Sequence, residues 1–123
     1  MSEFTHFNDN GDAVMVDVSS KDDTVREAVA TGKIHMSSEC FKMVVEGSHA
    51  KGDVLGVARI AGIMGAKKTS ELIPLCHMLP LTKVEIEFET EDSTVTAYCR
   101  AKTVGKTGVE MEALTGVNVA LLT

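Results

Sequence analysis

The chain has 123 residues, the size of a single domain, and a net charge of −6 with 44% hydrophobic and 24% charged residues. This acidic balance argues against a nucleic-acid partner, which usually needs a basic face to neutralise phosphates. No apolar run approaches the ~20 residues that span a bilayer, and the polar N-terminus lacks a signal-peptide pattern. Because the three cysteines also suggest neither paired disulfides nor a metal knuckle, we expect a cytoplasmic protein without a membrane partner.

The first third of the chain predicts short elements separated by serine and glycine. Residues 13–19 have the pattern of a short extended segment. A helix should then run from a cap at Ser19 or Ser20 to a stop at Gly32, with valines and an alanine on one stripe. Residues 33–36 predict a brief strand.

Two further helices are predicted before the middle of the chain. One should begin at a serine cap, Ser37 or Ser38, and end at Gly47. The next should begin after an Asp53 cap and run to about Lys68. Its interior glycines each cost about 1 kcal/mol relative to alanine, so they predict close approach by another backbone or a ligand, and we expect close subunit packing at Gly56, Gly62 and Gly65.

The second half predicts a hairpin followed by a helix. Residues 81–90 alternate apolar and acidic side chains, and residues 94–104 return with a second alternating pattern, which indicates an antiparallel hairpin with one wet face. Residues 109–123 are helical in part, with an apolar stripe at Met111, Leu114, Val117 and Leu121 and no stop signal. We therefore expect an α+β fold, an antiparallel sheet with helices packed on one face, ferredoxin-like.

Basic side chains gather in two stretches of this acidic chain, residues 51–68 and 100–106. Charge alone favours two solvated faces, although the clustering is also typical of a local anion site for a phosphorylated small molecule. The GKTG turn at 105–108 is not a nucleotide-binding P-loop, because Arg100 stands where that motif requires glycine. An ATPase is excluded on that ground.

Lysines lie at both ends of the glycine-rich helix. Lys51 precedes its N-terminus, where the helix dipole would lower a lysine pKa and suit acid-base chemistry; a solvated loop lysine is the simpler alternative. Lys67 and Lys68 lie roughly 24 Å further along the helix axis. One subunit could hardly bring both ends to the same small ligand, so subunits must share the site if both ends bind it.

Four further residues are candidates for chemistry. Glu110 and Glu112 would project to one side of an extended chain but diverge by roughly 200° on a helix, so at least one can be aimed into a pocket. First-turn acids favoured by the helix dipole are an equally good explanation. Cys76 is more often a buried small hydrophobe than a nucleophile, whereas His77, in a loop between two prolines, is the better functional candidate. A metal site is disfavoured because no third ligand has suitable spacing.

Three stretches together closely resemble the MoaC family, the cyclic pyranopterin monophosphate synthases of molybdenum cofactor biosynthesis. They are KGDVLGVARIAGIMGAKKTSELIPLCHMLPL, GKTGVEMEALTGV and, near the start, MVDVS. The resemblance covers nearly the whole chain. It implies a lyase that rearranges the 3′,8-cyclo-7,8-dihydro derivative of GTP to cyclic pyranopterin monophosphate and releases diphosphate, without a cofactor.

The resemblance also implies roles for individual residues. It places the catalytic lysine at Lys51, which with Glu112 would act as acid and base while His77 positions the substrate or relays a proton. Lys67 and Lys68 would contact the triphosphate. The remaining substrate contacts of the family would fall on Leu75, Cys76, His77, Met111 and Glu112, and we expect Glu110 to be a further contact. Family members are hexamers, trimers of dimers with sites between subunits, which agrees with the separation of Lys51 from Lys67.

The C-terminus departs from the family pattern. Family members continue into a segment with an Asp and a Lys three residues apart, then a strand and a Gly-Gly-Lys-Ser tail, none of which occurs in these 123 residues. We therefore expect residues 1–123 to form a single MoaC-like domain without that segment. Two alternatives follow: a module that binds the nucleotide without converting it, and a plain α+β structural domain.

Overall fold

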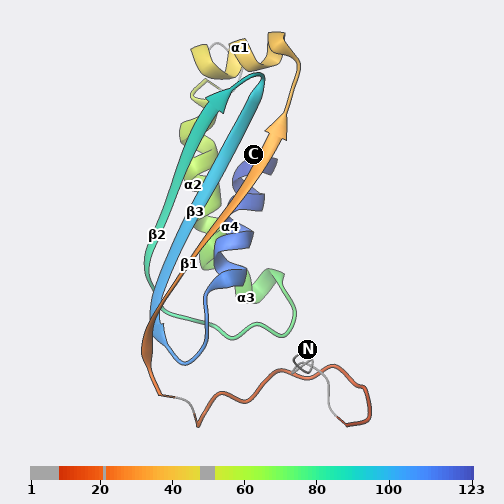
Figure 1. The fold of residues 1–123 in the computed structure, drawn as a ribbon, viewed down its shortest axis with the longest axis vertical. Helices are drawn as coiled ribbons and strands as arrows, with labels where there is room; N and C mark the ends of the chain where they lie inside the picture. Colours follow the sequence, from red (N-terminus) through yellow and green to blue (C-terminus); the bar gives the residue numbers. More distant parts are fainter. Residues whose placement is uncertain (1–8, 21, 48–51) are drawn as a thin grey trace.

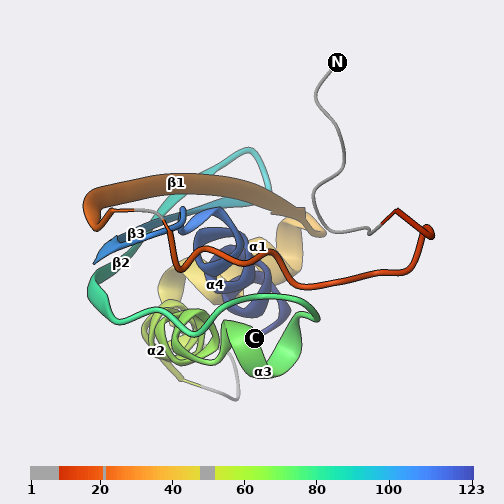
Figure 2. The ribbon, with the colours of Figure 1, turned by 90° about the horizontal axis from the view of Figure 1, so that it is seen from below.

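The computed structural model describes residues 9–20, 22–47 and 52–123. The described elements are β1 (Thr24–His35), α1 (Ser38–Glu46), α2 (Val54–Lys67), α3 (Thr69–Leu72), β2 (Leu81–Glu91), β3 (Thr94–Gly105) and α4 (Glu110–Leu122). The strands form one antiparallel sheet in the order β1-β3-β2, and α2 and α4 cover one of its faces (Figures 1 and 2). The fold is α+β and consistent with a ferredoxin-like arrangement, which confirms the prediction.

The helix predicted to end at Gly32 is wrong, because residues 24–35 form the strand β1. β1 pairs along its whole length with β3, from Thr24 opposite Gly105 to His35 opposite Thr94. The inward residues in the middle of β1 are small: Ala30 is buried, and a Cβ on Gly32 would come within 2.9 Å of two side chains of α4. Pairing with β3 and packing under α4 thus override the helical preference of the alanines. The strand predicted at 33–36 is the end of β1.

The hairpin of β2 and β3 is confirmed. The two strands pair antiparallel, with Ile86 opposite Cys99 and Glu91 opposite Thr94. The predicted inward residues of β3 are all buried, at 4% exposure or less: Val95, Ala97, Cys99 and Ala101. The side chains that alternate with them lie on the open face of the sheet, as the pattern predicts for a sheet with one wet face.

The predicted caps of α1 and α2 are also confirmed. The Ser37 hydroxyl accepts the Cys40 N–H at 3.1 Å, and Gly47 ends α1 in the left-handed conformation, with φ of 70°. Asp53 accepts the Gly56 N–H at 3.0 Å and so caps the start of α2. Gly56 therefore lies against the capping carboxylate of its own helix.

Small residues bring α2 and α4 together. A Cβ on Gly62 would collide with Ile86 and come within 2.8 Å of the carbonyl oxygen of Gly116, and one on Gly65 would lie 2.7 Å from Val119. These glycines therefore serve close packing within the chain, which confirms the predicted close approach of another backbone at Gly62, while packing between subunits stays a prediction. The predicted stripe of α4 is wrong at its start, because Met111 and Leu114 are 40% and 44% exposed. The helix instead buries Ala113, Gly116, Val117 and Ala120.

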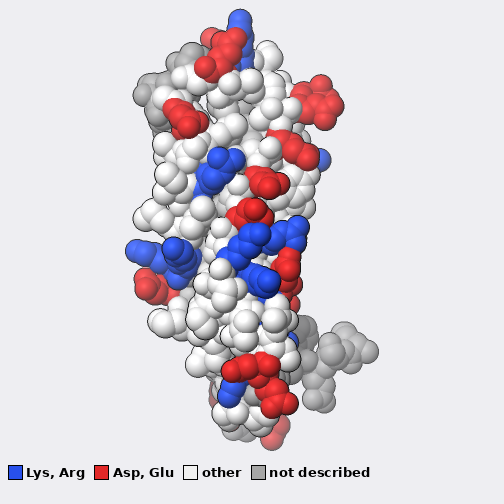
Figure 3. Space-filling view, turned by 90° about the vertical axis from the view of Figure 1, so that its left-hand side faces the viewer, with Lys and Arg blue, Asp and Glu red and all other residues white. Residues whose placement is uncertain are grey.

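One end of the fold gathers the loops. There the end of α2, the helix α3, the loop of residues 73–80 and the start of α4 meet, and residues 9–20 pass below them (Figures 1 and 2). Among the described residues, none of the helices combines the length and hydrophobicity that a membrane-spanning helix requires. On the side that faces the viewer in Figure 3, acidic and basic side chains are interspersed and form no continuous basic surface.

Candidate active site

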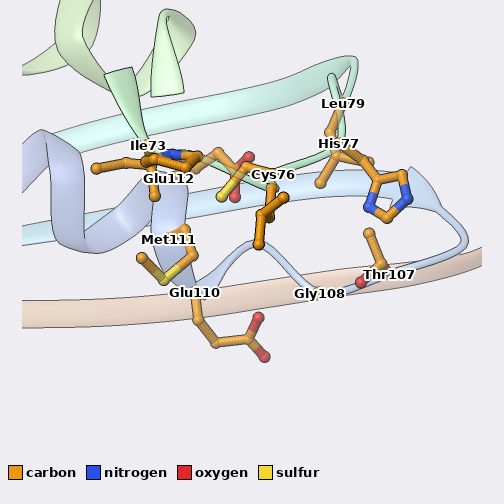
Figure 4. Close-up of a pocket in the computed structure, with 11 residues that line it drawn as sticks. Ile73, Cys76, His77, Leu79, Thr107, Gly108, Glu110, Met111 and Glu112 are labelled. Carbon is orange, nitrogen blue, oxygen red and sulfur yellow. The ribbon is translucent and has the colours of Figure 1, made fainter. Parts of the chain in front are cut away.

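A cavity of about 460 Å³ lies at this end of the fold, between the 73–80 loop and the start of α4 (Figure 4). Its size is that of a site for a small organic ligand. The lining mixes apolar side chains with a few polar ones: Ile73, Pro74, Leu75, Cys76, His77, Leu79, Thr107, Gly108, Glu110, Met111 and Glu112. Six residues predicted from sequence as substrate contacts thus surround one cavity, although they come from two segments more than thirty positions apart.

The 73–80 loop carries the first of these segments. It contains no helix or strand, as the flanking prolines predict, because proline cannot donate a backbone hydrogen bond. Leu75 has a φ of 64°, a left-handed conformation that costs a side chain other than glycine about 1–2 kcal/mol. The turn at Leu75 precedes Cys76 and His77, whose side chains line the cavity. Backbone strain of this kind tends to persist where it serves a site.

The second segment enters the site through the loop that joins β3 to α4. Thr107 lies beside the His77 ring in Figure 4, and Gly108 follows it in the wall of the cavity. A Cβ on Gly108 would collide with the carboxylate of Glu110, so glycine is needed for that side chain to fold back over the loop. The loop therefore shapes the wall opposite Cys76.

Glu110 and Glu112 diverge, as the helical alternative predicted. Glu110 is exposed and its carboxylate points away from Cys76, whereas the Glu112 carboxylate points toward Cys76 (Figure 4). Glu112 is only 5% exposed. Burial raises the pKa of its carboxyl, opposed by a hydrogen bond from its own backbone N–H and reinforced by the nearby charge of Glu110. The site thus holds a carboxyl group that keeps its proton to higher pH than an exposed glutamate.

The Cys76 thiol is partly buried, and burial raises its pKa, with a further contribution from the negative charge of Glu112. A raised pKa leaves less of the reactive thiolate near neutral pH. Cys76 therefore lines the cavity as a neutral group. This geometry agrees with a substrate contact and disfavours a nucleophile.

The lysines predicted as phosphate contacts occupy different positions. Lys67, in the last turn of α2, borders a small cavity of about 10 Å³ that His77 and Glu112 also line. Lys68 forms the junction between α2 and α3 and lines neither cavity. Lys51 falls outside the described residues. The structure thus brings Lys67, but not Lys68, beside the acid and the imidazole of the site.

The basic stretch at residues 100–106 is not a single anion site. Arg100 lies on the open face of the sheet, where it forms ion pairs with Glu27 of β1 and, at 3.8 Å, with Glu85 of β2. The hydrogen bond from Arg100 holds the pKa of the Glu27 carboxyl below its ordinary value. Arg100 thus belongs to a solvated face, as charge alone favours, and Lys106 is the basic residue of this stretch in the loop that borders the cavity.

Sequence reasoning missed several residues of the site. Thr107 and Gly108 belong to the GKTG turn, from which the sequence alone predicts no substrate contact. Asp17 lies in the MVDVS motif, to which the sequence assigns no individual role. The pKa of Asp17 is lowered chiefly by hydrogen bonds from Ser19, including the Ser19 N–H at 2.9 Å, and to a lesser degree by the charge of His77. The resemblance of MVDVS to the family motif was a signal for this segment, although its nearness to His77 depends on the fold.

Among the described residues, no three His, Cys, Asp or Glu side chains are grouped so that they could hold a metal ion. The polar groups around the cavity are instead two carboxyls, an imidazole, a thiol and a hydroxyl. Such a set can donate and accept protons and hydrogen bonds. It suits a rearrangement that depends on proton transfer and orientation.

Comparison with known proteins gives a consistent result. The model of the MoaC family matches residues 15–123. The chain is 59% identical to the cyclic pyranopterin monophosphate synthase of Heliobacterium modesticaldum and 58% identical to that of Cereibacter sphaeroides, over all of this chain and 79% of each relative. It is 56% identical to the enzyme of the same name from Thermomicrobium roseum, over 75% of that protein. The chain therefore belongs to the MoaC family.

Proposed function

We propose that this chain is a cyclic pyranopterin monophosphate synthase of molybdenum cofactor biosynthesis, a lyase that acts on the 3′,8-cyclo-7,8-dihydro derivative of GTP. The main observation in support is that the LCH residues (75–77) and the ME residues (111–112) line one cavity, with the buried Glu112 carboxyl in its wall. The names of relatives at 56–59% identity support the same activity. These names favour an enzyme over a module that binds the nucleotide without converting it, and over a plain structural domain.

Release of diphosphate requires a hydroxyl oxygen of the substrate to attack the α-phosphorus while the bond from that phosphorus to the bridging oxygen of the diphosphate breaks. The hydroxyl proton must pass to a base, and the developing negative charge on the leaving diphosphate must be stabilised. Lys67 would supply the stabilising positive charge from the small neighbouring cavity that His77 and Glu112 also line. The accompanying ring rearrangement requires proton transfers, for which we assign Glu112 as acid, Lys51 as acid or base, and His77 as a positioning or relay group.

The remaining lining residues would hold the substrate in register. Leu75 and Met111 provide apolar contact for a flat ring system, while Cys76 and Glu110 provide polar edges to the same cavity. Lys68 remains a proposed triphosphate contact only at longer range, because it lines neither this cavity nor the small one that Lys67 borders. Together, these contacts would use binding energy to orient the reacting ribose, phosphate and ring of the substrate.

The place of Lys51 in the sequence, directly before Gly52, supports a site shared between subunits. Gly52, the described residue next to it, precedes the start of α2, and the pocket lies at the other end of this helix of 14 residues, about 20 Å away. We therefore propose a homo-oligomer, a hexamer built from dimers, in which Lys51 of one subunit reaches the pocket of another. Since the three cysteines are free thiols, we also propose a reducing, cytoplasmic location.

Turnover by a Lys51→Ala variant tests the assignment. The enzymatically prepared cyclic GTP derivative would be incubated with each protein, and the product would be oxidised to a fluorescent pterin while diphosphate is assayed separately. We expect the parent chain to form both products and Lys51→Ala to form neither while its thermal unfolding is unchanged. Tight binding of guanine nucleotides by the parent chain without diphosphate release would instead support the binding module.

A further inference from the structure

Arg26 is a cation of β1 that sequence analysis did not single out. It is opposite Thr103 of β3, and its side chain lies on the helix-covered side of the sheet with the other inward residues of β1. Its Nη2 donates a hydrogen bond to the backbone carbonyl oxygen of Lys106 at 3.4 Å, across 80 positions of sequence. The guanidinium thus joins β1 to the loop that connects β3 with α4.

That loop forms one wall of the cavity. Lys106 precedes Thr107 and Gly108, which line the cavity, and Glu110 folds back over Gly108. Glycines at both ends of the loop, Gly105 and Gly108, permit more backbone conformations than other residues would. A contact from outside the loop restricts this freedom, and the hydrogen bond from Arg26 is such a contact.

The surroundings of Arg26 do not explain it as a stabilising residue. None of the ion pairs among the described residues includes Arg26. Its Nε is buried without a hydrogen-bond partner. A buried donor without a partner costs roughly 1–3 kcal/mol of folding stability, and an apolar side chain of similar length would avoid that cost. Arginine at this position therefore costs stability that an apolar side chain would not, and what it adds is the contact with the loop.

We propose that Arg26 is a positioning residue of the site, which holds the 105–108 loop against β1 and so fixes Thr107 and Gly108 in the wall of the cavity. This inference rests on the proposed function for its effect on turnover, although its effect on the loop does not. Arg26 acts through the Lys106 carbonyl oxygen. It need not contact the substrate.

The test compares Arg26→Met, which keeps an apolar stem but removes the donors, with Arg26→Lys and with Arg100→Met as the matched control. Arg100 lies on the open face of the same sheet and contacts neither the loop nor the cavity. Hydrogen exchange of amides 105–108, thermal unfolding, and KM and kcat for diphosphate release would be measured on each protein. The exchange measurement requires no substrate.

We expect Arg26→Met to speed amide exchange in the loop and to raise KM, each by about tenfold, as for the loss of one hydrogen bond from a charged donor. Its unfolding temperature should stay the same or rise. In Arg26→Lys, the exchange rate and KM should both lie between those of the parent and of Arg26→Met. Millimolar guanidinium should partly restore the KM of Arg26→Met. Arg100→Met should keep the exchange rate and KM of the parent. Unchanged loop exchange in Arg26→Met, or equal changes in Arg100→Met, would overturn the proposal. Absence of turnover in the parent chain would overturn the proposed function alone, because loop exchange would still decide the role of Arg26.

Discussion

Glu110 and Glu112 lie two residues apart in the first turn of α4, yet Glu112 is buried against Cys76 while Glu110 is exposed and folds over Gly108. The same helix therefore gives two carboxyl groups different environments. The desolvated carboxyl keeps its proton to higher pH, and the exposed one supplies a nearby negative charge that reinforces this effect. Separating two acids by environment is a common way to assign one of them to proton donation.

Glu112→Gln should stabilise the fold at neutral pH while it abolishes turnover. The folded pKa of Glu112 is raised above 4.5, so its contribution to stability is greatest below that value and is lost as pH rises through the raised pKa. Glutamine cannot ionise, and we expect a gain on the order of 1 kcal/mol at pH 7, the scale of one buried polar group.

Thermal unfolding of both proteins between pH 4 and pH 7 checks this prediction. The advantage of Glu112→Gln should grow as pH rises, and Glu110→Gln should show little pH-dependent difference because Glu110 is exposed. A Glu112→Gln variant that is less stable than the parent at pH 7 would show that the ionised carboxylate is a favourable part of the fold.

Lys67→Ala should impair the reaction more than Lys68→Ala. Lys67 borders the small cavity that His77 and Glu112 share, whereas Lys68 lines neither cavity. Loss of one charge-assisted contact to a phosphate corresponds to about 1.5–3 kcal/mol, or roughly 10- to 100-fold in kcat/KM. Steady-state kinetics of diphosphate release would compare the two variants, and equal losses in both would refute the distinction that the geometry draws between them.

The three thiols should react at different rates. Cys99 is fully buried, and burial raises its pKa to about 11; burial and Glu112 also raise the pKa of Cys76. Because the thiolate is the reactive form, alkylation at pH 7.5 should label Cys40 first, Cys76 slowly and Cys99 only after unfolding. Peptide mass spectrometry over a time course gives the order. Rapid labelling of Cys76 in the folded protein would mean that its thiol is ionised and that it could serve as a nucleophile after all.

Gly62→Ala should destabilise the fold by about 1–3 kcal/mol, the usual cost of overpacking a well-packed core. The added Cβ would collide with Ile86 and crowd the carbonyl oxygen of Gly116, a backbone atom that cannot turn away. Gly105→Ala is the matched control, because the nearest atoms to its Cβ would lie 3.8 Å away. Denaturant unfolding of the two variants measures the difference, which should vanish if α2 and α4 can separate without cost.

The sequence predicted the parts of this fold whose signals are local. The Ser37 and Asp53 caps and the alternation along β2 and β3 act between residues close in the chain, and all of them are confirmed. The helix prediction for β1 is wrong because the inward residues in the middle of the strand, Ala28, Ala30 and Gly32, are small, and their small size is understood only from the close packing of α4 above them. For the same reason, the buried face of α4 follows its small residues rather than Met111 and Leu114.

The residues of the candidate site also fall into those that a local motif predicts and those that only long-range contacts reveal. The LCH and ME residues were found through motifs, and their convergence on one cavity agrees with that prediction. Arg26 was missed because its contact with Lys106 spans 80 positions and leaves no local pattern. Long-range contacts of this kind depend on strand register, which the sequence could not supply while β1 was assigned as a helix.

The contact of Gly62 with Gly116 also has a consequence for the alignment of the site. α2 and α4 run in opposite directions, so that Lys67 lies five residues beyond Gly62 on one helix and Glu112 four residues before Gly116 on the other. The backbone contact fixes how far each helix can slide along its neighbour. A substitution in the middle of this helix pair would therefore reach the chemistry as a change in the spacing between a cation and a carboxyl, although it alters no group that meets the substrate.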